Sequence, residues 1–402
     1  MIDGWEIKTL GDISVMMADG PFGSNLKKEH YTENREVRII QLSNIGEDGW
    51  REENTKYTTF KHLETIQRSE VFPNDIVIAK MMPAGRAIIC PNHEKKFVLS
   101  SDAVKVQLKK GVNLRFAWYS INSPYFRKQV YENVAGSGRV RTSLTKLKLC
   151  KLRLPSLPEQ QRIVDILDRE FAKIDALKAN AEKSLQAAKD LFQATLKKEL
   201  EPKEGWKVSS MGEVSSIARG GSPRPIKAFI TEDADGINWI KIGDTEVGGK
   251  YISSTKEKIR KEGMRSSRFV EAGDFLLSNS MSFGRPYILK TNGCIHDGWL
   301  VIKKYEDTFT QDFLYYLLLS PSVVKQFEEG ARGSTVRNLN TDIVSAVRVS
   351  YPSTLQEQEE IVARVEEQNY KCKALQDNYQ KTLSLCDDLK QSLLRKAFNG
   401  EL

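Results

Sequence analysis

The 402-residue sequence has no uninterrupted apolar stretch that approaches the roughly 18 residues needed to span a bilayer. Its strongest apolar concentration, Phe313 to Leu319, is about a third of that length and includes two tyrosines. The amino terminus lacks the basic region followed by an apolar run that marks a secretory signal. We therefore expect a cytoplasmic protein.

Cysteine and histidine are scarce, and neither is arranged to bind a metal. The five cysteines are odd in number and include no CxxC pair. Buried free thiols are therefore expected in place of a disulfide framework or a zinc site. The four histidines are scattered and form no HExxH-type group. The sequence predicts no metal site.

The motifs of several enzyme classes are also missing. Gly248-Gly249-Lys250 is followed by a tyrosine and lacks the upstream glycine of a phosphate-binding loop. A dinucleotide fingerprint that starts at Gly136 fails because Arg141 stands in its last position. The Asn/Asp-Pro-Pro-aromatic tetrapeptide of an adenine methyltransferase does not occur. The sequence thus predicts no catalytic residue and no cofactor bound by this chain.

One arrangement loosely resembles the acidic-acidic-x-Lys pattern of metal-dependent nucleases, because Asp75 is followed by Glu94-Lys95-Lys96. The second half of the chain keeps the equivalent Asp274 but has Asn292-Gly293-Cys294 where the Glu-x-Lys should be. The two aspartates are better explained as turn residues before buried strands. The pattern therefore argues against a nuclease.

Positive charge is in excess and is unevenly distributed. The net charge is +8. Residues 1–154 carry 25 Lys and Arg against 17 Asp and Glu, and residues 201–350 carry 21 against 19. The segments 155–200 and 351–402 are nearly balanced, at 8 against 8 and 7 against 9. A basic globular surface is typical of a protein that binds a polyanion, usually nucleic acid.

The sequence is a tandem repeat. Gly4-Trp5 and the following Leu10-Gly11 recur as Gly205-Trp206 and Met211-Gly212, at an offset of 201. Gly85-Arg86 matches Gly284-Arg285 at an offset of 199, and Glu159-Gln160 matches Glu357-Gln358 at an offset of 198. A register that drifts by so little across a half-chain indicates a duplication.

Each copy opens with short apolar runs separated by Gly, Pro, Asn and Asp, which is typical of strands bounded by turns. Residues 113–127 and 313–327 have the apolar spacing of a helix. We predict an α/β fold of the mixed α+β type, with two globular domains at residues 1–154 and 203–351.

Each copy closes with a long helix, predicted at residues 155–202 and 352–402. A proline stands near each start, Pro158 and Pro352, where its missing N–H costs nothing. Roughly 43 residues without glycine or proline follow, and at 1.5 Å per residue they form a rod of about 65 Å.

An apolar seam with 3–4 spacing runs along both helices and predicts a coiled coil. Because the helices follow duplicated domains, the simplest closure is an antiparallel pair with pseudo-twofold symmetry. Both seams carry a polar residue at the same place, Lys178 and Gln376. The seam residues are Val164, Leu167, Phe171, Ile174, Lys178, Ala181, Leu185, Ala188, Phe192 and Thr195 in the first helix, and Val362, Val365, Asn369, Cys372, Gln376, Tyr379, Leu383, Cys386, Lys390 and Leu393 in the second.

Three pairs of loops combine small residues with cationic or hydrogen-bonding side chains. Glycine lets a backbone approach a phosphate, and Arg, Lys, Ser and Asn supply donors to phosphates and bases. Surface turns with incidental charges are the alternative interpretation. The candidate DNA contacts are Ser24, Asn25, Lys27, Lys28, Lys80, Arg86, Ser137, Arg139 and Arg141 in the first copy, and Arg219, Ser222, Arg224, Asn279, Ser280, Ser282, Arg285, Arg332, Ser334 and Arg337 in the second.

Two variable globular regions, each opened by a Gly-Trp phrase, are thus each closed by a long helix. A proline-then-Glu-Gln phrase introduces each helix, at Leu154–Val164 and Tyr351–Gln358. The second phrase departs from the first, having Thr354-Leu355-Gln356 in place of Leu157-Pro158. Over essentially its whole length, the chain resembles the specificity subunits of type I restriction–modification enzymes.

The resemblance implies that each globular part is a target recognition domain for one half of a split site in double-stranded DNA. The helices would set the half-site separation and dock two methyltransferase subunits. Adenine-N6 methylation with S-adenosylmethionine, and restriction or translocation with ATP and Mg²⁺, would belong to partner subunits. Because the recognition loops differ between the copies, the whole DNA site should be asymmetric.

The main alternative is a duplicated DNA-binding regulator or architectural protein that works without an enzyme partner. A stand-alone modification enzyme is disfavoured because the methyltransferase motif is missing. A subunit of a related system, in which methyltransferase and nuclease share one chain, stays open.

Overall fold

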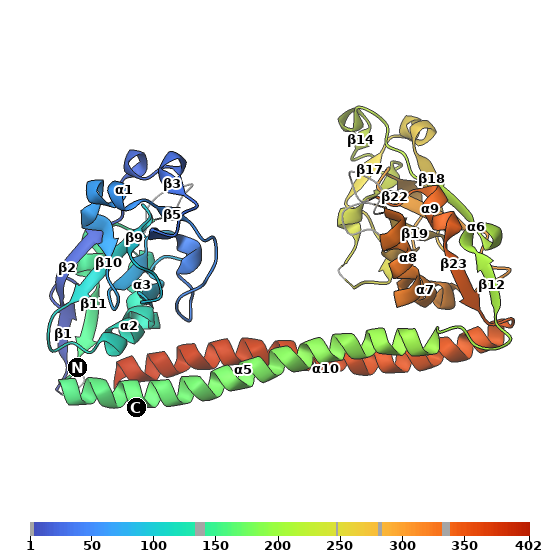
Figure 1. Cartoon of the computed structure of the whole chain (residues 1–402). Coiled ribbons are helices and arrows are strands. Elements are labelled where there is room, and N and C mark those ends of the chain that lie inside the picture. Colours follow the sequence, from blue (N-terminus) through green and yellow to red (C-terminus); the bar gives the residue numbers. More distant parts are fainter. Residues whose placement is uncertain (1–3, 133–140, 247, 280–283, 332–337) are drawn as a thin grey trace. The chain divides into compact units, whose positions relative to one another are not determined.

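The computed structural model describes residues 4–132, 141–246, 248–279, 284–331 and 338–402. The chain divides into two compact units. Unit 1 comprises Met1–Ala181 with Lys381–Leu402, and unit 2 comprises Glu182–Gln380. Each unit holds one globular domain and a part of each long helix (Figure 1). Among the described residues, no helix is both long and apolar enough to cross a membrane.

The domain of unit 1 is built on two main sheets. The first is antiparallel, in the order β2 (Ser14–Asp19), β10 (Ala103–Leu108), β7 (Ile76–Ala79) and β8 (Ala87–Ile89). The second has the order β3 (Tyr31–Thr32), β5 (Tyr57–Thr58), β4 (Val37–Ile40), β9 (Phe97–Leu99) and β6 (Glu70–Val71), with β4 and β9 parallel. A two-stranded sheet pairs β1 (Glu6–Thr9) with β11 (Lys151–Leu154).

The domain of unit 2 repeats this plan. Its first sheet has the order β13 (Ser216–Arg219), β22 (Trp299–Lys303), β19 (Phe275–Ser278) and β20 (Pro286–Leu289), extended by β16 (Tyr251–Ile252). The second has the order β14 (Ile230–Thr231), β17 (Glu257–Ile259), β15 (Ile237–Ile240), β21 (Gly293–Ile295) and β18 (Arg268–Val270), with β15 and β21 parallel. Strands β12 (Lys207–Ser210) and β23 (Arg348–Tyr351) pair separately. The predicted mixed α/β class and two-domain organisation are confirmed.

The short helices correct one detail of the prediction. Residues 113–127 and 313–327 were each expected to be a single helix, but each segment contains two. The break falls at Ser123 and Ser320, whose ψ angles of 153° and 145° are extended. A proline follows each serine, and its ring disfavours the helical conformation of the residue before it. The resulting helices are α2 (Leu114–Asn122) and α3 (Pro124–Glu132), and α7 (Gln311–Leu319) and α8 (Pro321–Ala331), besides the shorter α1 (Phe60–Thr65), α4 (Leu144–Leu149), α6 (Met211–Val214) and α9 (Thr341–Ala346).

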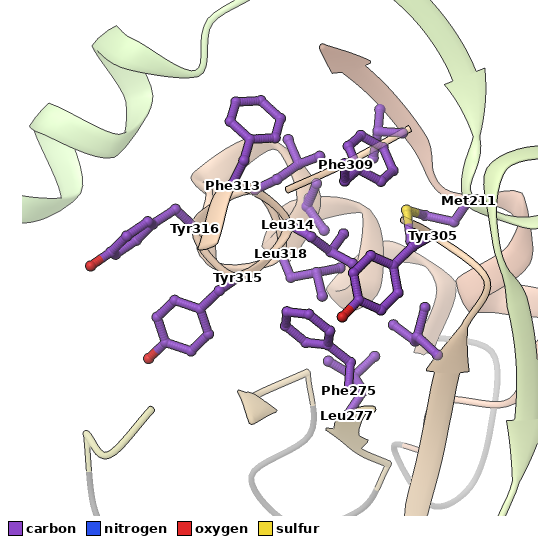
Figure 2. Close-up of a cluster of buried hydrophobic side chains, with 14 of the residues drawn as sticks. Met211, Phe275, Leu277, Tyr305, Phe309, Phe313, Leu314, Tyr315, Tyr316 and Leu318 are labelled. Atoms are coloured by element: carbon purple, nitrogen blue, oxygen red, sulfur yellow. The ribbon is translucent and has the colours of Figure 1, made fainter. Parts of the chain in front are cut away.

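The central strands are continuously apolar because both faces of the first sheet are covered. In β19, Phe275 and Leu277 pack into the cluster that contains α7, and Leu276 packs into a separate cluster on the other face. Figure 2 shows the first cluster, where Leu314 and Leu318 of α7 lie on the side of the helix that faces Phe275 and Leu277 and the ring of Phe313 points away from them. The alternating direction of strand side chains therefore divides one apolar run between two cores.

The long helices are α5 (Leu157–Glu199) and α10 (Leu355–Asn399). In unit 1, the amino-terminal part of α5 lies beside the carboxyl-terminal part of α10. An ion pair of 2.7 Å between Lys178 and Asp387 joins them. In unit 2, the opposite ends pair, with Arg364 2.9 Å from Glu199. The pairing within each unit is thus antiparallel. Every predicted seam position in both helices is buried or half-buried, which confirms the seam.

The Glu-Gln phrase joins each long helix to the globular domain of its unit. The Gln160 amide is buried, accepts a hydrogen bond from the Asn113 backbone N–H at 2.8 Å and donates to the Pro155 carbonyl at 2.9 Å. Gln358 likewise accepts from Thr310 N–H at 2.9 Å, and it donates to a carbonyl of the domain, that of Thr308, at 2.8 Å. Asn113 and Thr310 cap α2 and α7, so this glutamine fixes where the domain sits on its helix.

Replacing Gln160 with alanine is expected to lower the free energy of unfolding by about 1–3 kcal/mol, because two buried backbone groups lose their partner. Urea unfolding measures the change, with Gln161→Ala, at an exposed neighbouring position, as the control. Equal midpoints for both variants would contradict a structural role for the buried glutamine.

A second contact between domain and helix uses an equivalent tyrosine and carboxylate in each unit. Tyr119 of α2 donates a hydrogen bond to Asp168 of α5, and Tyr316 of α7 lies 3.5 Å from Glu366 of α10. In unit 1 the cation that pairs with the helix carboxylate is Arg115, 2.6 Å from Asp168.

The equivalent of Arg115 in unit 2 is Asp312, a reversal of charge. Lys250, on a loop, compensates by lying 2.7 Å from Asp312 and 3.1 Å from Glu366. Both domains therefore bring a cation to the helix carboxylate, but from different elements.

Candidate nucleic-acid interface

The glycine-rich turn after β2 presents four of the predicted contacts. Ser24, Asn25, Lys27 and Lys28 are all exposed, and the nearest carboxylate of Lys27, that of Glu29, is 3.8 Å away. These side chains are therefore accessible to a polyanion.

The glycine that opens this turn has a packing role that the sequence analysis did not recognise. A Cβ on Gly20 would lie 1.8 Å from the Ser100 carbonyl oxygen, and one on Gly220 would lie 2.2 Å from that of His296. Any side chain here would collide with backbone. We expected these glycines to let the backbone approach a phosphate. In the structure they instead let it approach another backbone segment of the same domain.

In unit 2 the predicted residues of two loops meet around Asp297. The Ser222 hydroxyl donates to the Asp297 carboxylate at 2.8 Å, and a guanidinium nitrogen of Arg224 lies 3.6 Å from it. Arg219 and Asn279 both donate to the Asp297 backbone carbonyl, at 3.2 and 2.8 Å. The hydrogen bond from Ser222 holds the pKa of Asp297 below its usual range. The backbone carbonyl and the charged carboxylate of Asp297 thus together organise this loop cluster.

An open groove of about 1040 Å³ adjoins the cluster. Its lining includes Lys241, Trp239 and His296, none of which was predicted from the sequence. Burial lowers the pKa of His296. A signal for Lys241 existed, because it replaces Gln41 within a phrase that both copies share.

Lys80 is placed differently from the other lysines. Its side chain is largely buried, and its ammonium lies 2.6 Å from Asp19. The equivalent residues in unit 2 are Asn279 and Arg219, which share the Asp297 carbonyl. The two domains thus use the same pair of positions for different internal contacts. DNA contact by Lys80 stays a prediction and requires this ion pair to open.

The repeated Gly-Arg phrases share a backbone conformation. Gly85 and Gly284 have φ angles of +82° and +77°, which glycine adopts readily and other residues rarely. This conformation explains why both copies have a glycine before the arginine. Arg86 donates to the Pro83 carbonyl at 3.1 Å, and Arg285 lines a cavity with residues of α5, α7 and α10.

Of the remaining predicted residues, Arg141 is half-exposed and paired with Asp102. The others lie outside the described residues, namely Ser137, Arg139, Ser280, Ser282, Arg332, Ser334 and Arg337. In the described parts of both units, no three His, Cys, Asp or Glu side chains are grouped to hold a metal ion. All five cysteines are buried free thiols, as predicted.

The family model for the type I restriction modification DNA specificity domain matches residues 2–187 and again residues 203–381. The chain belongs to this family. It is a DNA sequence-recognition subunit of a restriction–modification complex. Membership disfavours the alternative of a regulator without an enzyme partner.

The chain is similar over its whole length to two specificity subunits. It is 23% identical to that of the type I restriction enzyme StySPI from Salmonella potsdam and 23% identical to that of EcoKI from Escherichia coli K12, covering 89% of each. Among solved structures, it matches a chain from a study of type I R-M complex assembly and conformational transition at a TM-score of 0.77 (19% identity, 100% and 99% of the two chains). It matches the HsdS subunit from Thermoanaerobacter tengcongensis at 0.54 (17% identity, 100% and 98%). At these identities the structures share the fold.

The helices of this specificity subunit also expose leucines at repeated positions. Leu177 and Leu191 of α5 are 50% and 48% exposed, and their repeat equivalents in α10, Leu375 and Leu389, are 40% and 48% exposed. Single exposed leucines are ordinary, but exposed leucines that occur at equivalent positions in both copies of a repeat indicate an interaction surface.

Heptad positions place these leucines in pairs. With seam residues at positions a and d, all four leucines occupy position g, and g residues flank one another in an antiparallel pair. Unit 1 therefore holds the pair of Leu177 and Leu389, and unit 2 holds Leu191 and Leu375. Asp168, which binds the domain, occupies the opposite e flank. Each leucine pair thus lies on the flank away from its domain.

Proposed function

We propose that the chain is the non-catalytic recognition subunit of a type I restriction–modification enzyme, in which residues 1–154 and 203–351 are target recognition domains. Each domain reads one half of a bipartite, asymmetric site in double-stranded DNA. The observation that carries the proposal is a duplicated backbone frame whose side chains differ between the copies, as in the turns that begin at Gly20 and Gly220. Different side chains on one frame suit two different half-sites.

The exposed loop residues are the proposed DNA contacts. In the first domain these are the side chains of the turn after β2, together with Arg141. In the second they are the exposed Arg219 and Arg224 and the half-buried Ser222, around Asp297. Arginine and lysine there supply phosphate contacts, which position the protein, and the polar side chains and the adjacent groove supply base contacts, which determine sequence preference.

The helices, residues 155–202 and 352–402, act in this proposal as spacers and as docking sites for two methyltransferase subunits. Two equivalent leucine pairs, one in each unit, support a stoichiometry of two. The partner subunits would contribute S-adenosylmethionine-dependent adenine-N6 methylation, and a restriction or translocase subunit would contribute ATP- and Mg²⁺-dependent activity.

Methylation mapping tests the proposed function. The chain is expressed with the methyltransferase encoded beside it, and methylated adenines are mapped across the host genome. We expect a split, asymmetric motif that disappears when this chain is omitted. Methylation that is unchanged without the chain would refute its role as the specificity determinant.

Substituting Arg219 and Arg224 with alanine is expected to weaken binding to cognate duplex DNA by about tenfold or more, through loss of phosphate contacts. The affected preference should be confined to one half-site, because both arginines belong to one domain. Binding to duplexes with either half-site scrambled measures this. The double variant Lys27→Ala/Lys28→Ala should affect the other half-site, and equal losses at both half-sites from either variant would contradict one reader per domain.

A further inference from the structure

Each unit has a cavity where its domain meets the two long helices, and the two cavities are equivalent in the repeat. The cavity of unit 1 is about 370 Å³ and is lined by residues that include Tyr119 and Gln391. The cavity of unit 2 is about 600 Å³ and is lined by the repeat equivalents Tyr316 and Gln193. The side chains that line the two cavities can therefore be compared position by position.

The charge of the cavity lining is inverted between the units. Four carboxylates and two cations line the cavity of unit 1, whereas four cations and one carboxylate line that of unit 2. Two e positions of the helices contribute to the change; Asp175 lines the cavity of unit 1, whereas Asp387 lies outside that lining. Asp175 of α5 corresponds to Lys373 of α10, and Asp387 of α10 corresponds to Lys189 of α5.

In unit 1 two lysines of the helix seam, the buried Lys390 and the half-buried Lys178, pair with carboxylates in or beside the cavity. Lys390 lies 2.6 Å from Asp175 and 2.9 Å from Asp48, with its side chain 7% exposed. Lys178 lies 2.7 Å from Asp387. This cavity therefore already contains its counter-charges.

Unit 2 has no such internal balance. The equivalents of the two seam lysines are Phe192 and Gln376. Lys250 is paired with two carboxylates, but the ion pairs of the described residues include none for Lys189, Lys373 or Arg285. All three side chains are exposed and line one partly enclosed space, so an anion bound there would lie among three cations.

The occupant must be specific to unit 2. A partner bound as two identical copies, or a DNA backbone that passes both domains, presents the same charge to both units and so does not explain the inversion. Tyr315, which lines the same cavity, points its hydroxyl away from the apolar cluster (Figure 2). Burial raises its pKa to about 12, so the hydroxyl keeps its proton and can donate a hydrogen bond.

We propose that the unit 2 cavity binds a nucleoside polyphosphate, with Lys189, Lys373 and Arg285 contacting the phosphates and Tyr315 donating a hydrogen bond. The cavity volume is within the range of small-ligand sites, roughly 300–1,000 Å³. Guanidinium and ammonium groups are the usual partners of phosphate oxygens. The specificity subunit would then carry an effector site in one half only.

Isothermal titration of the full-length chain with ATP, and separately with pyrophosphate, tests the proposal. We expect one site per chain. The variant Lys189→Asp/Lys373→Asp installs the residues of the unit 1 framework and should weaken binding by about tenfold or more. Lys189→Arg/Lys373→Arg should keep binding. The control Lys183→Asp/Lys198→Asp makes the same change of net charge at exposed positions of α5 outside the cavity and should bind as the wild type does.

Thermal melting verifies that each variant is folded before titration. The proposal is overturned if neither ATP nor pyrophosphate binds saturably at millimolar concentration, or if the control loses as much affinity as the cavity variant. It is also overturned if only duplex DNA responds to the cavity variant, since the cavity would then belong to the DNA interface. None of these results bears on the methylation mapping, so the two proposals fail separately.

Discussion

Deleting residues 178–184 together with residues 376–382 is expected to shorten the spacer between the two half-sites by about three base pairs. One heptad removed from each helix shortens the pair by about 10 Å at 1.5 Å per residue, and base pairs rise about 3.4 Å each. Because the deleted segments are equivalent in the repeat, the a and d positions that remain still meet in register. Methylation at the original motif should disappear, and mapping should reveal the same half-sites at the shorter separation.

A deletion in one helix only is the control for this prediction. It leaves the two seams of unequal length, so we expect loss of the folded complex and no new motif. If the matched deletion kept the original spacing, the helices would not determine the distance between the half-sites. The partner subunits would then have to set that distance.

Replacing Leu177 and Leu389 with glutamate is expected to remove one of two methyltransferase subunits. Both leucines are exposed on the g flank of unit 1, so the substitutions should leave the seam intact. Loss of well-packed apolar contacts in an interface typically costs ~2 kcal/mol or more, which is about a thirtyfold loss of affinity. Native mass spectrometry of the purified complex should therefore count one bound subunit in place of two.

The repeat supplies a matched variant and a control for that experiment. Leu191→Glu/Leu375→Glu should remove the other subunit, and all four substitutions together should remove both. Leu385→Glu changes a leucine that is 55% exposed but whose repeat equivalent is Ala187, and it should keep two subunits. Two subunits bound to the Leu177→Glu/Leu389→Glu variant would place the docking surface elsewhere.

Sequence patterns predicted the parts of this fold that depend on local periodicity. The seam of α10 could be assigned despite Asn369, Gln376 and Lys390 because its apolar positions keep the 3–4 spacing and align with those of α5. The helix breaks at Ser123 and Ser320 were also available from the sequence, since each serine precedes a proline. The longer apolar pattern on both sides of the break concealed them.

The candidate site was less accessible to prediction because its contacts join residues far apart in the chain. Lys80 resembles a free cation in a loop, yet Asp19 lies 61 residues away and neutralises it. Arg219 and Arg224 were predicted as cations, but no pattern marks Asp297, whose backbone carbonyl contacts Arg219 and whose carboxylate lies near Arg224. Repetition identified the loops, and tertiary packing decided which side chains in them are exposed.

The contact between each domain and its helix bears on how such genes diversify. The helix supplies a carboxylate, Asp168 or Glu366, and the domain supplies both the tyrosine and the cation, from Arg115 in one domain and Lys250 in the other. Each domain therefore supplies most of the side chains that attach it to its helix. Recombination that moved a whole domain onto the other helix would transfer tyrosine and cation together, so a new target specificity could arise in one step without compensating changes in the helices.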